Sequence, residues 1–290
     1  MEIKPRKMWI AGTLAFFTIG LGHLYAGDIR KGVFLFLGQG LLTIIAISLL
    51  LTVPKSSIII NIFVIFLIYS LYNIIDAIIL ARRNSNKRYQ LKIYNKLYIY
   101  ILVLVVSNFI ITPVCGSLIK RNFMASYKIP TGSMIPTILL GDQIISNQLI
   151  YKYSKPSYGD IVIFKPPHKD TNYIKRIIGV SGDVIEIKDK KLFVNNIKQK
   201  ENYVAFSDNR IFPAYISRRD NCGPVTVPEN SVFLLGDNRD NSEDSRFWGM
   251  VDLKNVHGKA QNVYWSWDKK NIKVRWGRVF QGINFADKNN

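Results

Sequence analysis

Long apolar stretches dominate the first 119 residues of this 290-residue chain. The segments 33–53, 58–80 and 97–119 are each long and apolar enough to cross a hydrocarbon core of about 30 Å as helices. Residues 8–26 are weaker, because several glycines and a histidine interrupt them. The pattern predicts a membrane anchor over residues 1–120 with three full spans.

Charge around the apolar segments predicts their orientation. The 82–96 connection carries six basic residues and no acid: Arg82, Arg83, Lys87, Arg88, Lys92 and Lys96. Such an excess is typical of cytoplasmic connections, so the 97–119 helix would deliver the rest of the chain to the outside. If residues 8–26 also crossed, the basic residues Lys4, Arg6 and Lys7 would lie outside, against the same rule. We therefore expect 8–26 to form a re-entrant or interfacial arm.

From about residue 125 the pattern changes to short alternating runs between turns, which is typical of strands. Four Gly-Asp pairs, at 141, 159, 182 and 236, mark turns. The predicted strands are 143–150, 161–165, 173–180, 184–188, 192–194, 232–235 and 256–265. No helical period persists, so residues 121–290 are predicted to be a mainly-β domain with a compact, partly closed sheet system.

Composition narrows the function classes. The net charge of +19 is compatible with nucleic-acid binding, but much of the basic excess flanks the apolar segments, and no nucleic-acid motif is present. We expect no nucleic-acid partner. Two cysteines, Cys115 and Cys222, make no disulfide framework. His23, His168 and His257 lack metal-ligand spacing, so neither a metal nor a cofactor is expected.

Candidate chemistry lies in two places. Ser133 sits in the Pro- and Gly-framed stretch Ile129–Met134, and Lys175 lies on the apolar run 173–180. A free lysine holds its proton at neutral pH, but burial among apolar residues lowers its pKa and makes it a base for a serine. Taken singly, Ser133 reads as a turn residue and Lys175 as a snorkelling strand residue.

Four blocks of sequence carry a close resemblance to bacterial type I signal peptidases over most of residues 125–280. They are 129–142 (IPTGSMIPTILLGD), 158–164 (YGDIVIF), 173–183 (YIKRIIGVSGD) and 236–249 (GDNRDNSEDSRFWG). The resemblance implies a membrane-bound serine endopeptidase that removes signal peptides from exported preproteins through an acyl-enzyme. It also implies cleavage after small residues, in the manner of an Ala-x-Ala site.

The same resemblance assigns roles by position. Ser133 would be the nucleophile and Lys175 the general base, with Ser242 hydrogen-bonded to the Lys175 amine. The backbone N–H of Ser133 and the hydroxyl of Thr131, where the family more usually has serine, would form the oxyanion hole. The supporting charged residues would be Asp237, Asp244 and Arg246, the last two as a pair.

Substrate binding follows from the resemblance in the same way. An extended segment of the preprotein would add as a strand beside Tyr127–Pro130 and Asn172–Ile174. The pockets for its small side chains would be lined by Ile129, Pro130, Ile138, Tyr173 and Ile174. The partners would be exported preproteins and the lipid bilayer, with the protein-export translocon as a further candidate. The catalytic domain would face the extracytoplasmic side of the bacterial cell (inner) membrane.

Residues of about 187–231 lie between two of the matching blocks and are predicted to form an insertion subdomain. It has one cysteine, so a disulfide within it is excluded. Two other functions are considered. A self-cleaving repressor would need a DNA-binding segment where this chain has apolar spans. A catalytically inactive membrane scaffold that binds exported peptides would need Ser133, Lys175 or Ser242 to be lost, and all three are present.

Overall fold

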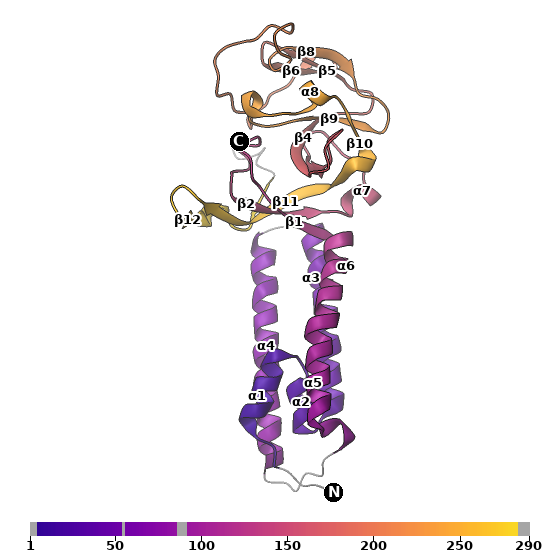
Figure 1. Ribbon diagram of the computed structural model, residues 1–290, viewed down its shortest axis with the longest axis vertical. Helices are drawn as coiled ribbons and strands as arrows, with labels where there is room; N and C mark the ends of the chain where they lie inside the picture. Colours follow the sequence, from indigo (N-terminus) through magenta and orange to yellow (C-terminus); the bar gives the residue numbers. More distant parts are fainter. Residues whose placement is uncertain (1–4, 54–55, 86–91, 284–290) are drawn as a thin grey trace. The chain divides into compact units, whose positions relative to one another are not determined.

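The computed structural model describes residues 5–53, 56–85 and 92–283, and the chain divides into two units, Met1–Ile119 and Lys120–Asn290 (Figure 1). The basic residues Lys4, Lys87 and Arg88 and the Pro54-Lys55 turn lie outside the described residues. Each unit has its own core, so each is described by itself.

Unit 1 contains three helices that are long and apolar enough to cross a membrane. The first is α3 (Ile29–Thr52) and the second is α4 (Ser56–Ser85). The third is continuous over Leu97–Asn122 and consists of α5 (Leu97–Val105), the π-helical turn η2 (Val106–Ile111) and α6 (Thr112–Asn122). The three apolar segments predicted from the sequence fall within these helices.

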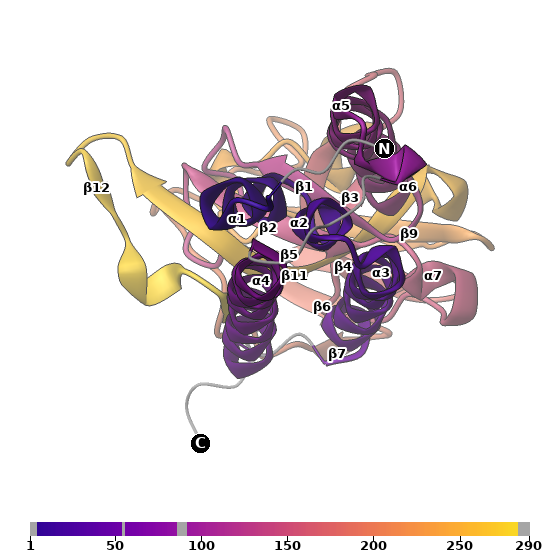
Figure 2. The ribbon, with the colours of Figure 1, turned by 90° about the horizontal axis from the view of Figure 1, so that it is seen from below.

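The weak segment 8–26 forms two short helices, α1 (Met8–Phe17) and α2 (Leu21–Ala26), which pack against α4, with α2 also against α3 (Figure 2). Ten residues of helix rise only about 15 Å, so α1 by itself is half as long as a span needs to be. Gly20 has a φ of +83°, and a Cβ there would lie 2.1 Å from the carbonyl oxygen of Gly32. The glycines of this segment therefore serve close helix packing.

Polar side chains of α4 hold the break between α1 and α2. Asn73 is fully buried; its Oδ1 accepts the Gly20 N–H at 3.0 Å, and its Nδ2 donates to the carbonyl of Ala15 at 2.9 Å. Asp76, one turn further along, contacts His23 Nε2 at 2.7 Å. Backbone groups released at a helix break need partners in apolar surroundings, and α4 supplies them.

We expect Asn73→Leu to lower the free energy of unfolding of the full chain in detergent by about 1–3 kcal/mol, because two backbone groups lose their partner. Denaturant titration monitored by circular dichroism measures this. Asn61→Leu, an exposed asparagine on the same helix, is the matched control and should not destabilise the protein. Equal stability of the two variants would contradict the role given to Asn73.

Unit 2 is built on an antiparallel sheet with strand order β1-β2-β11-β3-β4-β9-β10, and β12 and β13 pair with β11. The strands are β1 (Met124–Lys128), β2 (Asp142–Asn147), β3 (Ile161–Phe164), β4 (Tyr173–Val180), β9 (Ser231–Leu235), β10 (Val251–Asp252), β11 (Val256–Asp268), β12 (Lys273–Val274) and β13 (Gln281–Gly282). Two one-turn helices, α7 (Ile150–Tyr153) and α8 (Ser245–Trp248), join them. The predicted class, apolar helices followed by a mainly-β domain, is confirmed.

A second, smaller sheet has the order β7-β6-β5-β8. Its strands are β5 (Val184–Lys188), β6 (Lys191–Val194), β7 (Ile197–Lys198) and β8 (Cys222–Thr226). The small sheet runs from Val184 to Thr226, so both of its ends lie a few residues before the bounds predicted for the insertion. Val184 already pairs with Thr226 in the small sheet, whereas Ser231 begins β9 of the main sheet.

Several strand ends differ from the prediction, and the end of β2 has a clear cause. The run 143–150 was expected to be a single strand, but β2 ends at Asn147. The Asn147 side chain accepts the N–H groups of Leu149 and Ile150 at 2.9 and 3.1 Å. Asparagine commonly turns the chain in this way, and here it leads into α7.

The register of the main sheet brings the four blocks of sequence described above together in space. β4 lies between β3 and β9, with Lys175 opposite Val162 and Arg176 opposite Leu235. Because β9 ends at Leu235, the charged stretch 236–246 emerges directly beside the lysine segment. The apolar side chains around this point, including Ile129, Ile144 and Ile163, form one buried cluster.

Candidate active site

Ser133 and Lys175 are in direct contact. The Lys175 Nζ lies 2.7 Å from the Ser133 Oγ, although the two residues are 42 positions apart in the sequence. Both are buried, with relative exposures of 9% for Ser133 and 3% for Lys175. The turn after β1 presents the serine, and the central strand β4 presents the lysine.

The surroundings of Lys175 favour its uncharged form. Burial lowers the pKa of the Lys175 ammonium to about 8, against an ordinary value of 10.5. The carboxylates of Asp244, Asp237 and Glu243 oppose this shift, whereas Arg246 assists it. The ring of Tyr173 covers another side of the amine, with its centroid 5.8 Å from Nζ. The desolvation outweighs the carboxylates, so a sizeable fraction of the amine is neutral near neutral pH.

The start of the 236–246 stretch clamps the serine turn. Asn238 donates its backbone N–H to the carbonyl of Ser133 at 3.1 Å and its side-chain amide to the carbonyl of Gly132 at 3.0 Å. A Cβ at Gly236 would lie 2.5 Å from the Ser133 carbonyl oxygen and 2.2 Å from the Ser242 Oγ. Only glycine permits this approach, so Gly236 sets how closely the stretch packs on the serine.

Asp237 links the lysine strand to the serine turn. Its carboxylate accepts hydrogen bonds from Arg176 Nε at 2.8 Å, Arg176 Nη2 at 2.7 Å and the Thr137 hydroxyl at 2.5 Å. All three residues are buried. The sequence analysis identified Asp237 but missed Arg176 and Thr137. An arginine inside an apolar strand needs a carboxylate partner, and that signal was present in the YIKR block.

Asp244 and Arg246 form the predicted pair. The Asp244 Oδ1 accepts from Arg246 Nε at 2.8 Å, and Oδ2 accepts from Nη2 at 2.8 Å and from the Gly236 N–H at 3.1 Å. The Arg246 Nη2 also donates to the carbonyl of Arg239 at 2.7 Å. The pair thereby ties both ends of the 236–246 stretch together beneath Lys175.

The contacts of Ser242 differ from those predicted. Its buried hydroxyl has no hydrogen-bond partner in the described part of the chain, and the expected bond to the Lys175 amine is not formed. The amine contacts Ser133 instead, and Ser242 packs against Gly236. Ser242 is thus held near the pair through packing of its own turn.

A cleft of about 340 Å³ opens at Ser133 and Lys175. Its remaining lining comprises Tyr127, Lys128, Ile129, Pro130, Thr131, Ile144, Ile163, Thr171, Asn172, Tyr173, Ile174, Asn241 and Glu243. Four of the predicted substrate residues, Ile129, Pro130, Tyr173 and Ile174, line it. Thr131 lies exposed in the wall, two positions before Ser133.

Ile138 is the exception among the predicted lining residues. It is fully buried and belongs to the core cluster below the cleft. Its place is taken by Ile144 and Ile163, which the sequence analysis did not name. Ile144 lies on β2 and Ile163 on β3, with β11 between the two strands. The alternation of inward and outward side chains along each strand could have identified both isoleucines as inward-facing. Within residues 5–53, 56–85 and 92–283, no three His, Cys, Asp or Glu side chains are grouped to hold a metal ion.

The known proteins that this chain resembles are signal and processing peptidases. The family described as signal peptidase, peptidase S26, matches residues 98–265, more than half of the chain, and the chain belongs to that family. Thylakoidal processing peptidase 1 of Arabidopsis thaliana is 37% identical over 166 residues, covering 53% of this chain and 46% of the plant protein. A signal peptidase I of Leptolyngbya laminosa is 34% identical over 154 residues, covering 50% of this chain and 71% of that protein.

A crystal structure of a signal peptidase I from Enterococcus faecalis V583 is also similar. It has 33% sequence identity and a TM-score of 0.31, and the match covers 37% of this chain and 97% of that one. The chain spans about half the length of the plant relatives that it matches.

The titration of Lys175 can be measured directly. In the full chain labelled with ¹³C at lysine Cε, the Lys175 signal, assigned as the one missing from Lys175→Met, should titrate near pH 8 because of burial. A lysine fully exposed to water ordinarily titrates at about 10.4. Titration of Lys175 together with the exposed lysines would show that its site is not dry.

Proposed function

We propose that this protein is a membrane-bound serine endopeptidase that removes signal peptides from exported preproteins. The observation that carries the proposal is the 2.7 Å contact between the buried Lys175 amine and the Ser133 hydroxyl at the edge of an apolar cleft. Membership in the signal peptidase family supports the reaction class, and the similar proteins carry the names of processing and signal peptidases.

The proposed reaction uses Lys175 as a base and then as an acid. Neutral Lys175 accepts the proton of the Ser133 hydroxyl while Oγ attacks the scissile carbonyl carbon. The Lys175 ammonium then protonates the leaving nitrogen as the C–N bond breaks, which leaves an ester on Ser133. Water adds to this ester with Lys175 again accepting a proton, and the returning proton restores the Ser133 hydroxyl. The products are the signal peptide with a new carboxylate and the mature protein with a new amino terminus.

Charge on the carbonyl oxygen needs donors during both additions. We assign this role to the Ser133 backbone N–H and the Thr131 hydroxyl, because Thr131 shares the cleft wall with Ser133. Donors of this kind typically contribute about 10²–10³ in rate. The β-branched side chain of threonine has fewer χ1 choices than serine, which favours a fixed donor direction.

The proposed substrate is an extended segment with small side chains next to the cut. The edge stretches Tyr127–Pro130 and Asn172–Ile174 both border the cleft, which suits addition of a strand between them. Alternate side chains of such a strand would point at the floor made by Ile144, Ile163 and Ile174. A floor of branched apolar side chains in a small cleft suits alanine-sized groups one and three positions before the cut.

The charged pairs Asp237–Arg176 and Asp244–Arg246 are proposed to keep this site rigid, and Ser242 is proposed to act through its packing on Gly236. The alternative function, an inactive scaffold that binds exported peptides, would not need a dry lysine in contact with a serine. That contact therefore favours the enzyme.

We expect Ser133→Ala and Lys175→Met each to abolish cleavage of a preprotein with an Ala-x-Ala site, because one lacks the nucleophile and the other the base. The wild-type kcat/KM should rise about tenfold per pH unit below pH ~8 and level off above it, since only neutral Lys175 accepts a proton. The assay is cleavage followed by gel electrophoresis or mass spectrometry. Ser126→Ala and Lys191→Met, exposed residues of the same types, serve as controls and should cleave normally. Cleavage by either dyad variant would contradict the mechanism.

We further propose that α3, α4 and the helix Leu97–Asn122 cross the bacterial cell (inner) membrane. Unit 2 would then act on the extracytoplasmic side, where preproteins emerge from the export translocon. Basic residues at the end of α4 and just before the start of α5 support a cytoplasmic position for the 82–96 connection. The α1–α2 segment would enter the membrane from the cytoplasmic side and return.

A reporter that is active only in the cytoplasm should be active when fused before residue 8, because the α1–α2 segment does not cross. The same reporter fused after residue 290 should be inactive, and an export-dependent reporter should give the reverse pattern. Activity of the export-dependent reporter at the amino-terminal fusion would overturn the three-span topology.

A further inference from the structure

An irregular segment of the insertion, which includes Ala205 and Ser207, contacts the turn that carries Ser242. The two segments are distant in the sequence. The Ala205 N–H donates to the carbonyl of Asp237 at 2.9 Å, and the Arg239 N–H donates to the carbonyl of Ala205 at 3.0 Å. The Asn241 side-chain amide donates to the Ser207 hydroxyl at 2.7 Å. The turn is therefore bound on one side to Ser133 and on the other to the insertion.

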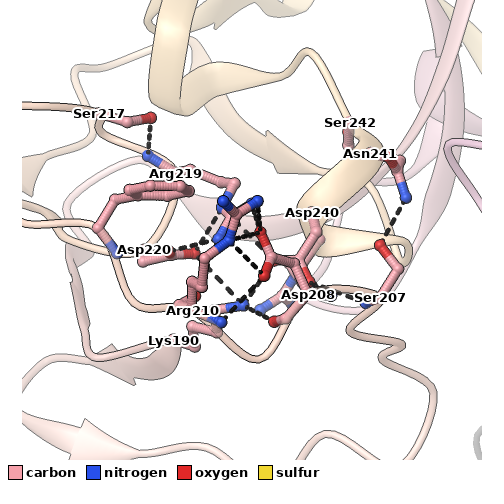
Figure 3. Close-up of polar contacts among 12 residues, drawn as sticks. Lys190, Ser207, Asp208, Arg210, Ser217, Arg219, Asp220, Asp240, Asn241 and Ser242 are labelled. Atoms are coloured by element: carbon pink, nitrogen blue, oxygen red, sulfur yellow. Dashed lines mark hydrogen bonds and ion pairs between the residues drawn. The ribbon is translucent and has the colours of Figure 1, made fainter.

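Asp240 lies at the centre of this second contact (Figure 3). Its side chain is 2% exposed, and its Oδ2 accepts the N–H groups of Ser207 and Asp208 at 2.8 Å each. Its Oδ1 accepts from Lys190 Nζ at 2.9 Å, and Arg219 Nε lies 3.6 Å away. A carboxylate so deeply buried depends on its cations, because removing one leaves its charge only partly compensated.

Lys190 belongs to the hairpin turn between β5 and β6, where its φ is +66°. Its side chain is 11% exposed, and Nζ also donates to the carbonyl of Asp208 at 2.5 Å. The lysine thus joins the small sheet, the irregular segment and the 239–241 turn at one point. The proposed reaction uses none of these groups directly.

The contact between Lys190 and Asp240 is linked to the reacting atoms through two further contacts. Asp240 fixes the turn, and the turn fixes Ser133 through the Asn238 N–H and places Ser242 against Gly236. Catalytic geometry tolerates little error, because a displacement of about 1 Å can cost roughly 100-fold in rate. A loosened turn would also uncover Lys175, because Asn241 and Glu243 of the stretch 236–246 line the same cleft as the lysine.

We propose that Lys190 is a positioning residue for the Ser133–Lys175 pair, acting through Asp240 and the turn that follows it. This role rests on the peptidase function proposed above. It makes the insertion part of the catalytic machinery.

The test compares Lys190→Met with Lys191→Met in the full chain in detergent. Methionine keeps an unbranched side chain as far as the ε position at the positive φ, and removes the Nζ ammonium with its charge and its two hydrogen bonds. We expect Lys190→Met to lower kcat about tenfold or more, with KM within about twofold, since binding residues of the cleft are untouched. Lys190→Arg, which keeps the charge, should recover most of the loss, and Lys191→Met should match wild type.

A second readout does not need turnover. The ¹³Cε titration of Lys175 in Lys190→Met should move to higher pH, because water reaches the amine. The groups that face Lys175 are Tyr173, Asp237, Glu243, Asp244 and Arg246, and all are kept in the variant. A shift therefore reports changed burial of the amine. Partial unfolding of the population would lower the signal of the folded form without moving its midpoint.

The outcomes separate the two proposals. Absence of preprotein cleavage by wild type would count against the peptidase function, and the Lys175 titration would still test Lys190. An unshifted midpoint in Lys190→Met, or a fall in kcat no larger than the unfolded fraction, would overturn the positioning role. If Lys190→Met does not fold, the neutral pair Lys190→Met with Asp240→Asn removes both charges together and restores folding. That double variant should still lose kcat and shift Lys175, and wild-type values for it would overturn the role.

Discussion

The site depends on keeping one amine dry. A lysine in water is nearly always protonated at neutral pH, and a protonated lysine can position a serine but cannot accept its proton. Lys175 meets this requirement because it lies on the central part of the sheet, between β3 and β9, and is covered by the 236–246 stretch. Ser133, by contrast, lines the cleft, where a peptide and water can reach its hydroxyl.

Charged groups beside a dry amine can raise or lower its pKa, and this gives a reason for pairing each carboxylate with an arginine. Asp237 and Asp244 alone would stabilise the ammonium and raise its pKa. Each carboxylate is held by an arginine, Arg176 in one case and Arg246 in the other, with contacts of 2.7 to 2.8 Å. The arginines offset the charge of the carboxylates, whose further hydrogen bonds hold the Thr137 hydroxyl and the Gly236 N–H. Buried pairs of this type are retained for geometry more readily than for stability.

Sequence patterns were sufficient for features that depend on local chemistry. Apolar length located the three long helices, alternation located most strands, and the motif blocks located Ser133, Lys175 and the Asp244–Arg246 pair. Features that depend on packing between distant segments were not accessible. Ile138 and Ile144 are both isoleucines near the serine block, and only the fold decides which one reaches the cleft. The packing of Ser242 follows from the close approach at Gly236, and the ends of the small sheet follow from the pairing of β5 with β8.

The irregular part of the insertion has a high entropic cost of ordering. Between β7 and β8 more than twenty residues have no helix and little strand, and ordering each costs about 1–2 kcal/mol of backbone entropy. Cys222 is the only cysteine of unit 2, so no disulfide within the unit offsets that cost. Contacts between charged side chains hold the insertion in place instead. Arg219 bonds to Asp220 and Asp208 and lies over the ring of Phe212, and Glu201 pairs with the buried Arg239 of the main domain. Because the Glu201–Arg239 and Lys190–Asp240 pairs end on the turn beside Ser133, the order of the insertion and the geometry of the dyad depend on the same ion pairs.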